Sequence, residues 1–146
     1  MLTAVRACLY VLGVSAIAIA LSILILGAEA TARMAESLFS LASGYRGGPS
    51  EHWPATMDSE LRFYAALWGA YGILALRSAL GLPQTLSQVP WIAAVFFVGG
   101  LGRIVSRCSL GAPHPFFTLL MIVELSLPVL MALFWLGALT ELRKGG

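Results

Sequence analysis

Three ionisable residues, Arg103, Arg107 and Glu124, lie inside the last two of four long apolar runs in this chain of 146 residues. A charge at the centre of a membrane-spanning helix costs roughly 2.5 to 3.5 kcal/mol on insertion scales, so such residues need a partner or a function. Arg103 and Glu124 each lie about ten residues from a turn at Pro113 and His114, which is roughly 15 Å of helix. Equal distances from one turn mean equal depth, so we predict that these two side chains form an ion pair near the middle of the membrane.

This ion pair has two possible roles. It either fixes the packing and register of the last two helices, or it belongs to a site that holds a polar head group or a proton. Pro128 follows Glu124 by one helical turn and has no N–H to donate to the Glu124 carbonyl. We therefore expect a bend beside the acid, which could form the wall of a pocket, although a proline bend also occurs without any site.

The second apolar run carries a polar and aromatic face. Its members repeat at helical spacing and are Glu60, Tyr64, Trp68 and Tyr71. Arg62 lies near the outer end of this run, and we expect Arg107 and His114 to approach the same end of the bundle. These residues could line the outer half of a cavity, and ordinary packing or an aromatic belt at the membrane interface is the alternative.

The runs that must position these residues are long enough to cross a membrane. They cover residues 7–28, 61–82, 90–110 and 115–139, and a helix of about 20 residues spans the roughly 30 Å hydrocarbon core. Apolar residues make up 59% of the chain and charged residues 11%, far from a soluble composition. We predict an all-α, integral membrane four-helix bundle that forms a single domain over residues 1–146. The first run is too long for a secretory signal, so we expect it to remain as a helix.

Basic residues near the predicted helix ends indicate the orientation. Arg6, Arg77, Arg143 and Lys144 flank one side, whereas the first loop, residues 29–60, is mainly acidic. The positive-inside rule then places both termini in the cytoplasm and the long first loop outside, in a multi-pass protein of the cell inner membrane. The first half of this loop should continue the first helix or lie along the membrane surface. The second half, residues 44–57, is either a lid or partner-contact loop or a mobile connector.

Two sets of small residues indicate where helices approach closely. They are Ala65, Gly69 and Gly72 in the second run, and Gly99, Gly100 and Gly102 in the third. Small residues let helix backbones come together in membranes. We expect these two surfaces to meet each other.

Several kinds of site and partner are excluded. The net charge of +2 is too small and too scattered for a nucleic-acid interface. Two cysteines and two histidines, all widely separated, give no metal-ligand cluster, and no histidine lies inside a predicted span to ligate a haem. We therefore expect no metal and no cofactor.

Three motifs and one acid resemble a known family. They are residues 60–68 (Glu-Leu-Arg-Phe-Tyr-Ala-Ala-Leu-Trp), residues 99–103 (Gly-Gly-Leu-Gly-Arg), residues 111–115 (Gly-Ala-Pro-His-Pro) and Glu124. Together they resemble an uncharacterised bacterial family of small four-span membrane proteins, catalogued as domain of unknown function 4345. The resemblance covers residues 7–139. It implies a four-helix inner-membrane protein and carries no reaction.

The leading functional hypothesis is a protein without enzymatic activity that binds a membrane lipid or another amphipathic small molecule. The tail would lie among the helices, with the head group near Arg103, Arg107, Glu124 and Tyr64. The alternative is an accessory or assembly subunit that binds a partner protein in a larger membrane complex. A third hypothesis is an intramembrane isomerase in which Glu124 moves a proton and Arg103 tunes it.

Overall fold

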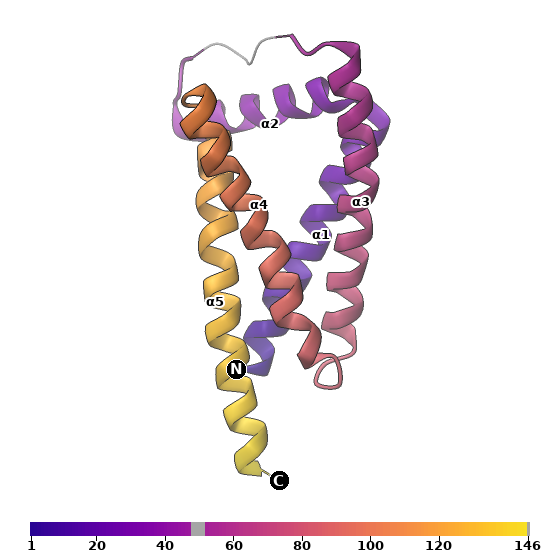
Figure 1. Cartoon of the computed structure of the whole chain (residues 1–146), viewed down its shortest axis with the longest axis vertical. Helices are drawn as coiled ribbons and strands as arrows, with labels where there is room; N and C mark the ends of the chain where they lie inside the picture. Colours follow the sequence, from indigo (N-terminus) through magenta and orange to yellow (C-terminus); the bar gives the residue numbers. More distant parts are fainter. Residues whose placement is uncertain (48–51, 146) are drawn as a thin grey trace.

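The computed structural model of the chain describes residues 1–47 and 52–145 (Figure 1). Within these residues the fold is all-α, as predicted. The helices are α1 (Leu2–Leu26), α2 (Ala28–Ser43), α3 (Ala55–Leu80), the short 3-10 helix η1 (Leu86–Gln88), α4 (Val89–Leu110) and α5 (Pro115–Gly145). By length and composition, α1, α3, α4 and α5 can each cross a membrane.

The ends of α4 lie close to the predicted residues 90 and 110, whereas the ends of the other long helices differ more from the prediction. The first helix begins at Leu2 and so includes Arg6, whose side chain finds acceptors at the end of α3. Its Nε donates to the Ala79 carbonyl at 3.2 Å, and its Nη2 donates to the Leu82 carbonyl at 3.1 Å. α3 begins at Ala55 instead of residue 61, and α5 extends to Gly145 instead of residue 139. α5 continues through Pro128, which lies inside the helix.

The first half of the predicted first loop is a separate helix. α1 ends at Gly27, whose φ of +93° is readily adopted only by glycine, and α2 then crosses the end of the bundle instead of extending α1 (Figure 1). Of the two alternatives for this segment, continuation of the first helix is therefore wrong, and a helix along the membrane surface stays a prediction. The described part of the second half, residues 44–47 and 52–54, is irregular, whereas residues 55–57 form the first turn of α3. Residues 48–51 lie outside the described residues.

The four long helices associate as two pairs. α1 packs mainly on α3 and α4 mainly on α5, whereas α3 and α4 touch each other little. Figure 1 shows the two pairs close together near the termini and diverging toward α2. The buried apolar core accordingly lies in the terminal half of the bundle. It includes Val5, Leu9, Ala79, Val89, Ile92, Met131 and Ala138.

The two small-residue surfaces do not meet each other, so that prediction is wrong. A Cβ atom at Gly72 would lie 2.8 Å from the Gly13 carbonyl oxygen of α1. A Cβ atom at Gly100 would lie 3.1 Å from the Cβ of Glu124 in α5. Gly69 and Gly72 therefore pack on α1 and Gly100 packs on α5, whereas a Cβ atom at Gly99 or Gly102 would meet no described atom within 4 Å. Short side chains allow close approach without specifying which helix approaches.

Candidate functional site

The predicted ion pair is present between α4 and α5. Arg103 Nε donates to Glu124 Oε2 at 2.6 Å. The Glu124 side chain is 10% exposed and that of Arg103 is 37% exposed. The acid is therefore enclosed by the helices, while the base retains an open side.

Two neighbours hold this pair in place. Gly100 precedes Arg103 by less than one helical turn and lets α4 approach the Glu124 backbone closely, since any Cβ there would crowd Glu124 and Leu125. The Phe117 ring of α5 lies under the Arg103 guanidinium, 5.9 Å from Cζ to the ring centroid. A cation over an aromatic face is stabilised by the ring quadrupole, so α5 supplies both an acid and a ring to one base.

The pair forms part of the wall of a cavity of about 470 Å³ between the two helix pairs. The described residues that line it are Ile19, Ile23, Leu61, Tyr64, Ala65, Leu67, Trp68, Tyr71, Val95, Phe96, Gly99, Arg103 and Glu124. They come from the last two turns of α1, the central turns of α3 and α4, and the third turn of α5. The cavity thus extends from the middle of the bundle toward α2, where the pairs diverge.

An aromatic stack lines the cavity where it borders the buried apolar core. The Trp68 ring stacks on Tyr71 with centroids 5.0 Å apart and on Phe96 with centroids 5.9 Å apart. The Tyr71 hydroxyl donates to the Ile92 carbonyl at 2.7 Å, which ties α3 to α4. Both sequence alternatives for Trp68 and Tyr71 therefore hold, because these side chains pack between helices and also line the cavity.

The cavity opens between α3 and α4. Three of its lining residues on these helices are largely exposed, namely Tyr64, Leu67 and Val95. α3 and α4 touch little, which leaves this side without a covering helix in the described residues. The opening lies along the long sides of two helices that can cross a membrane.

Several residues predicted for the site lie elsewhere. Arg107 Nη1 donates to Thr118 Oγ1 at 3.2 Å, and Arg107 is not among the residues that line the cavity. His114 Nδ1 accepts from the Phe116 N–H at 3.2 Å in the turn before α5, and the His114 ring packs edge-on against Tyr45. Glu60 is exposed on α3 and also lies outside the cavity lining.

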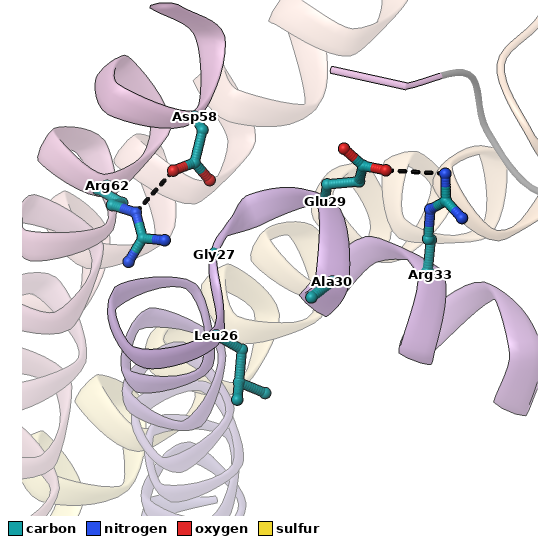
Figure 2. Close-up of a pocket in the computed structure, with 7 residues that line it drawn as sticks. All are labelled: Leu26, Gly27, Glu29, Ala30, Arg33, Asp58 and Arg62. Carbon is teal, nitrogen blue, oxygen red and sulfur yellow. Dashed lines mark hydrogen bonds and ion pairs between the residues drawn. The ribbon is translucent and has the colours of Figure 1, made fainter. Parts of the chain in front are cut away.

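Arg62 belongs to a second cavity, of about 310 Å³, at the joint between α1 and α2 (Figure 2). Asp58 lies in the first turn of α3, and its Oδ1 accepts from the N–H of Ala28, the first residue of α2, at 2.8 Å. Arg62 Nε pairs with Asp58 Oδ2 at 2.7 Å, and Arg62 Nη1 donates to the Leu24 carbonyl at 2.6 Å. These bonds join the end of α1 and the start of α2 to α3, which fixes the direction in which α2 leaves the bundle.

Glu29 of α2 binds residues 52 and 53, which lie just before the start of α3. Its carboxylate pairs with Arg33 at 2.7 Å, accepts from the Trp53 N–H at 3.3 Å and contacts His52 Nδ1 at 2.9 Å. Burial acts to raise the pKa of Glu29, but the bonds from Trp53 and His52 and the Arg33 charge outweigh it and hold the pKa below its usual value. Glu29 therefore remains ionised and bridges residues 52 and 53 to α2.

Sequence reasoning missed part of the cavity wall. Phe96, Gly99 and Arg103 follow one another at helical spacing on the same face of α4, and this periodicity around a charged residue was a usable signal. Ile19 and Ile23 of α1 gave no signal, because they lie in a uniformly apolar run.

The comparisons with known proteins add one match. A family model described as "Domain of unknown function (DUF4345)" matches residues 4–136, which include the ion pair and every residue that lines its cavity. No curated protein and no solved structure matches the chain.

Proposed function

This chain belongs to the DUF4345 family, and from that premise we propose that it is a multi-pass membrane protein that binds a lipid or another amphipathic small molecule between its helices. The observation that carries the proposal is one charged pair in the wall of an otherwise mainly apolar cavity of about 470 Å³. Pockets for small molecules are typically apolar, with a few placed polar groups that orient the ligand.

In the proposed complex the head group lies at the Arg103–Glu124 pair, with the Tyr64 hydroxyl also within the cavity wall. The tail leaves between α3 and α4, where Leu67 and Val95 are exposed. Because this opening faces the hydrocarbon region, a long tail can stay in the membrane while the head group is bound.

The proposal includes an orientation in the cell inner membrane, with both termini in the cytoplasm. The amino group of Met1 lies 3.2 Å from Glu141 Oε2, which places the two termini at the same end of the bundle. Arg6, Arg77, Arg143 and Lys144 lie toward that end, as the positive-inside rule requires of the cytoplasmic side. The cavity then faces the outer leaflet.

Two glycines on α4 provide a matched test. Gly99 lines the cavity and Gly102 does not, yet a Cβ atom at either position would meet no described atom within 4 Å. Gly99→Leu should therefore fill the cavity without crowding the helices, whereas Gly102→Leu places the same side chain outside it. Native mass spectrometry after gentle extraction should show a bound small molecule on the wild type and on Gly102→Leu, with occupancy reduced about tenfold or more on Gly99→Leu.

The other outcomes of this experiment separate the alternatives. An empty wild-type cavity, or equal occupancy in both leucine variants, would count against a ligand at this position. A stoichiometric protein partner in place of a small molecule would favour the accessory-subunit hypothesis. Chemical conversion of the bound molecule that is lost in Glu124→Gln would favour the isomerase hypothesis.

A further inference from the structure

The charges around the cavity restrict the head groups that it can accept. Among the described residues that line it, Arg103 and Glu124 are the charged ones, and they pair with each other at 2.6 Å. Their charges cancel, so the lining has no net charge. The rest of the wall is aliphatic, aromatic or glycine, apart from the hydroxyls of Tyr64 and Tyr71 and the Trp68 indole.

A charged head group would disturb this balance. An anion would bring a net negative charge into a low-dielectric cavity, or it would have to take Arg103 away from Glu124. Glu124 is buried and would then be left without its base, which is strongly unfavourable. A cation that attracted Glu124 would leave the Arg103 guanidinium alone in the same way.

An uncharged polar head group can bind without breaking the pair. A guanidinium carries several N–H donors, and the structure shows Arg103 donating to a described acceptor through Nε. The remaining donors can reach a carbonyl or hydroxyl oxygen on the open side of Arg103. An ionised carboxylate accepts more than one hydrogen bond, so Glu124 can also accept a hydrogen bond from a ligand hydroxyl while it holds Arg103.

We infer that this site selects amphipathic molecules with an uncharged head group that bears hydroxyl or carbonyl oxygens, of the acylglycerol type, and discriminates against lipids whose head groups carry a net charge. The inference rests on the proposed function.

Brominated single-chain probes can test the selectivity, because bromine quenches a tryptophan that it contacts and Trp68 lines the cavity. Three probes with the same brominated acyl chain are needed: an uncharged monoacylglycerol, an anionic lysophosphatidylglycerol and a cationic acylcholine. The full chain in detergent should show saturable quenching by the monoacylglycerol at a concentration about tenfold or more below that for either charged probe. Trp68→Phe should remove the saturable component and leave the quenching of the other tryptophans.

The outcomes distinguish this inference from the proposed function. If a charged probe binds as tightly as the monoacylglycerol, the head-group selectivity is wrong and the ligand site stands. If none of the probes gives saturable quenching of Trp68, both are wrong.

Glu124→Gln gives an independent check, because it leaves the cavity with the positive charge of Arg103. The preference should then move toward the anionic lysophosphatidylglycerol by about tenfold or more. An unchanged order of affinities in folded Glu124→Gln would overturn the inference. If that variant does not fold, the wild-type comparison decides alone.

Discussion

Replacing Glu124 with methionine is expected to destabilise the chain by about 3 kcal/mol or more, because the Arg103 guanidinium then loses its acid inside a membrane-spanning bundle. Arg103→Met should cost less. A carboxyl group left alone can take up a proton and become neutral, whereas a guanidinium keeps its charge. The measurement is the free energy of unfolding in mixed micelles, followed by tryptophan fluorescence during titration with SDS.

The double variant Arg103→Met/Glu124→Met is the control for this pair. It removes both charges and keeps the volume apolar, so its stability should be close to the wild type or above it. Its bound ligand should nevertheless be lost, because the polar anchor is gone. Equal destabilisation in the double variant and in Glu124→Met would show that the side chains stabilise the bundle by packing and not by their charges.

Gly72→Leu should separate α1 from α3 and destabilise the chain by about 3 kcal/mol. The first added carbon would already lie 2.8 Å from the Gly13 carbonyl oxygen and 2.8 Å from Ile17 Cγ1. Backbone cannot move aside as a flexible side chain can, so the helices themselves must shift. The same micelle titration measures the loss.

Gly102→Leu is the matched control, since it adds the same side chain where the described atoms leave open space. Its stability should lie within about 0.5 kcal/mol of the wild type. A Gly72→Leu variant as stable as Gly102→Leu would mean that α1 and α3 do not approach as closely as the structure places them.

The ion pair could be predicted from the sequence because a short hairpin leaves little choice. Two residues at equal distances from one turn must lie at equal depth, and opposite charges at equal depth in a membrane are strongly favoured to meet. The all-α fold class could also be predicted from the sequence, since uniformly apolar runs of membrane-crossing length permit few other structures.

The helix ends and helix partners could not be predicted in the same way. Aspartate is a residue type that often accepts hydrogen bonds from the first N–H groups of a helix. Asp58 does so for α2 and not for its own helix, and the N–H that it accepts from belongs to Ala28, which is distant in sequence. Gly72 and Gly100 indicate that another helix packs closely at these positions, but they do not indicate which helix it is. The cavity depends on how two helix pairs diverge, which is a property of the assembled bundle and not of any single run.

A density map of the full chain in lipid nanodiscs would show whether a ligand occupies the cavity between the two helix pairs. We expect α3 and α4 to remain apart in the half nearer α2, with elongated density between them that ends beside the Arg103–Glu124 pair. A map in which α3 and α4 close against each other, with side chains filling the space next to Trp68 and Gly99, would show that the bundle has no ligand site there.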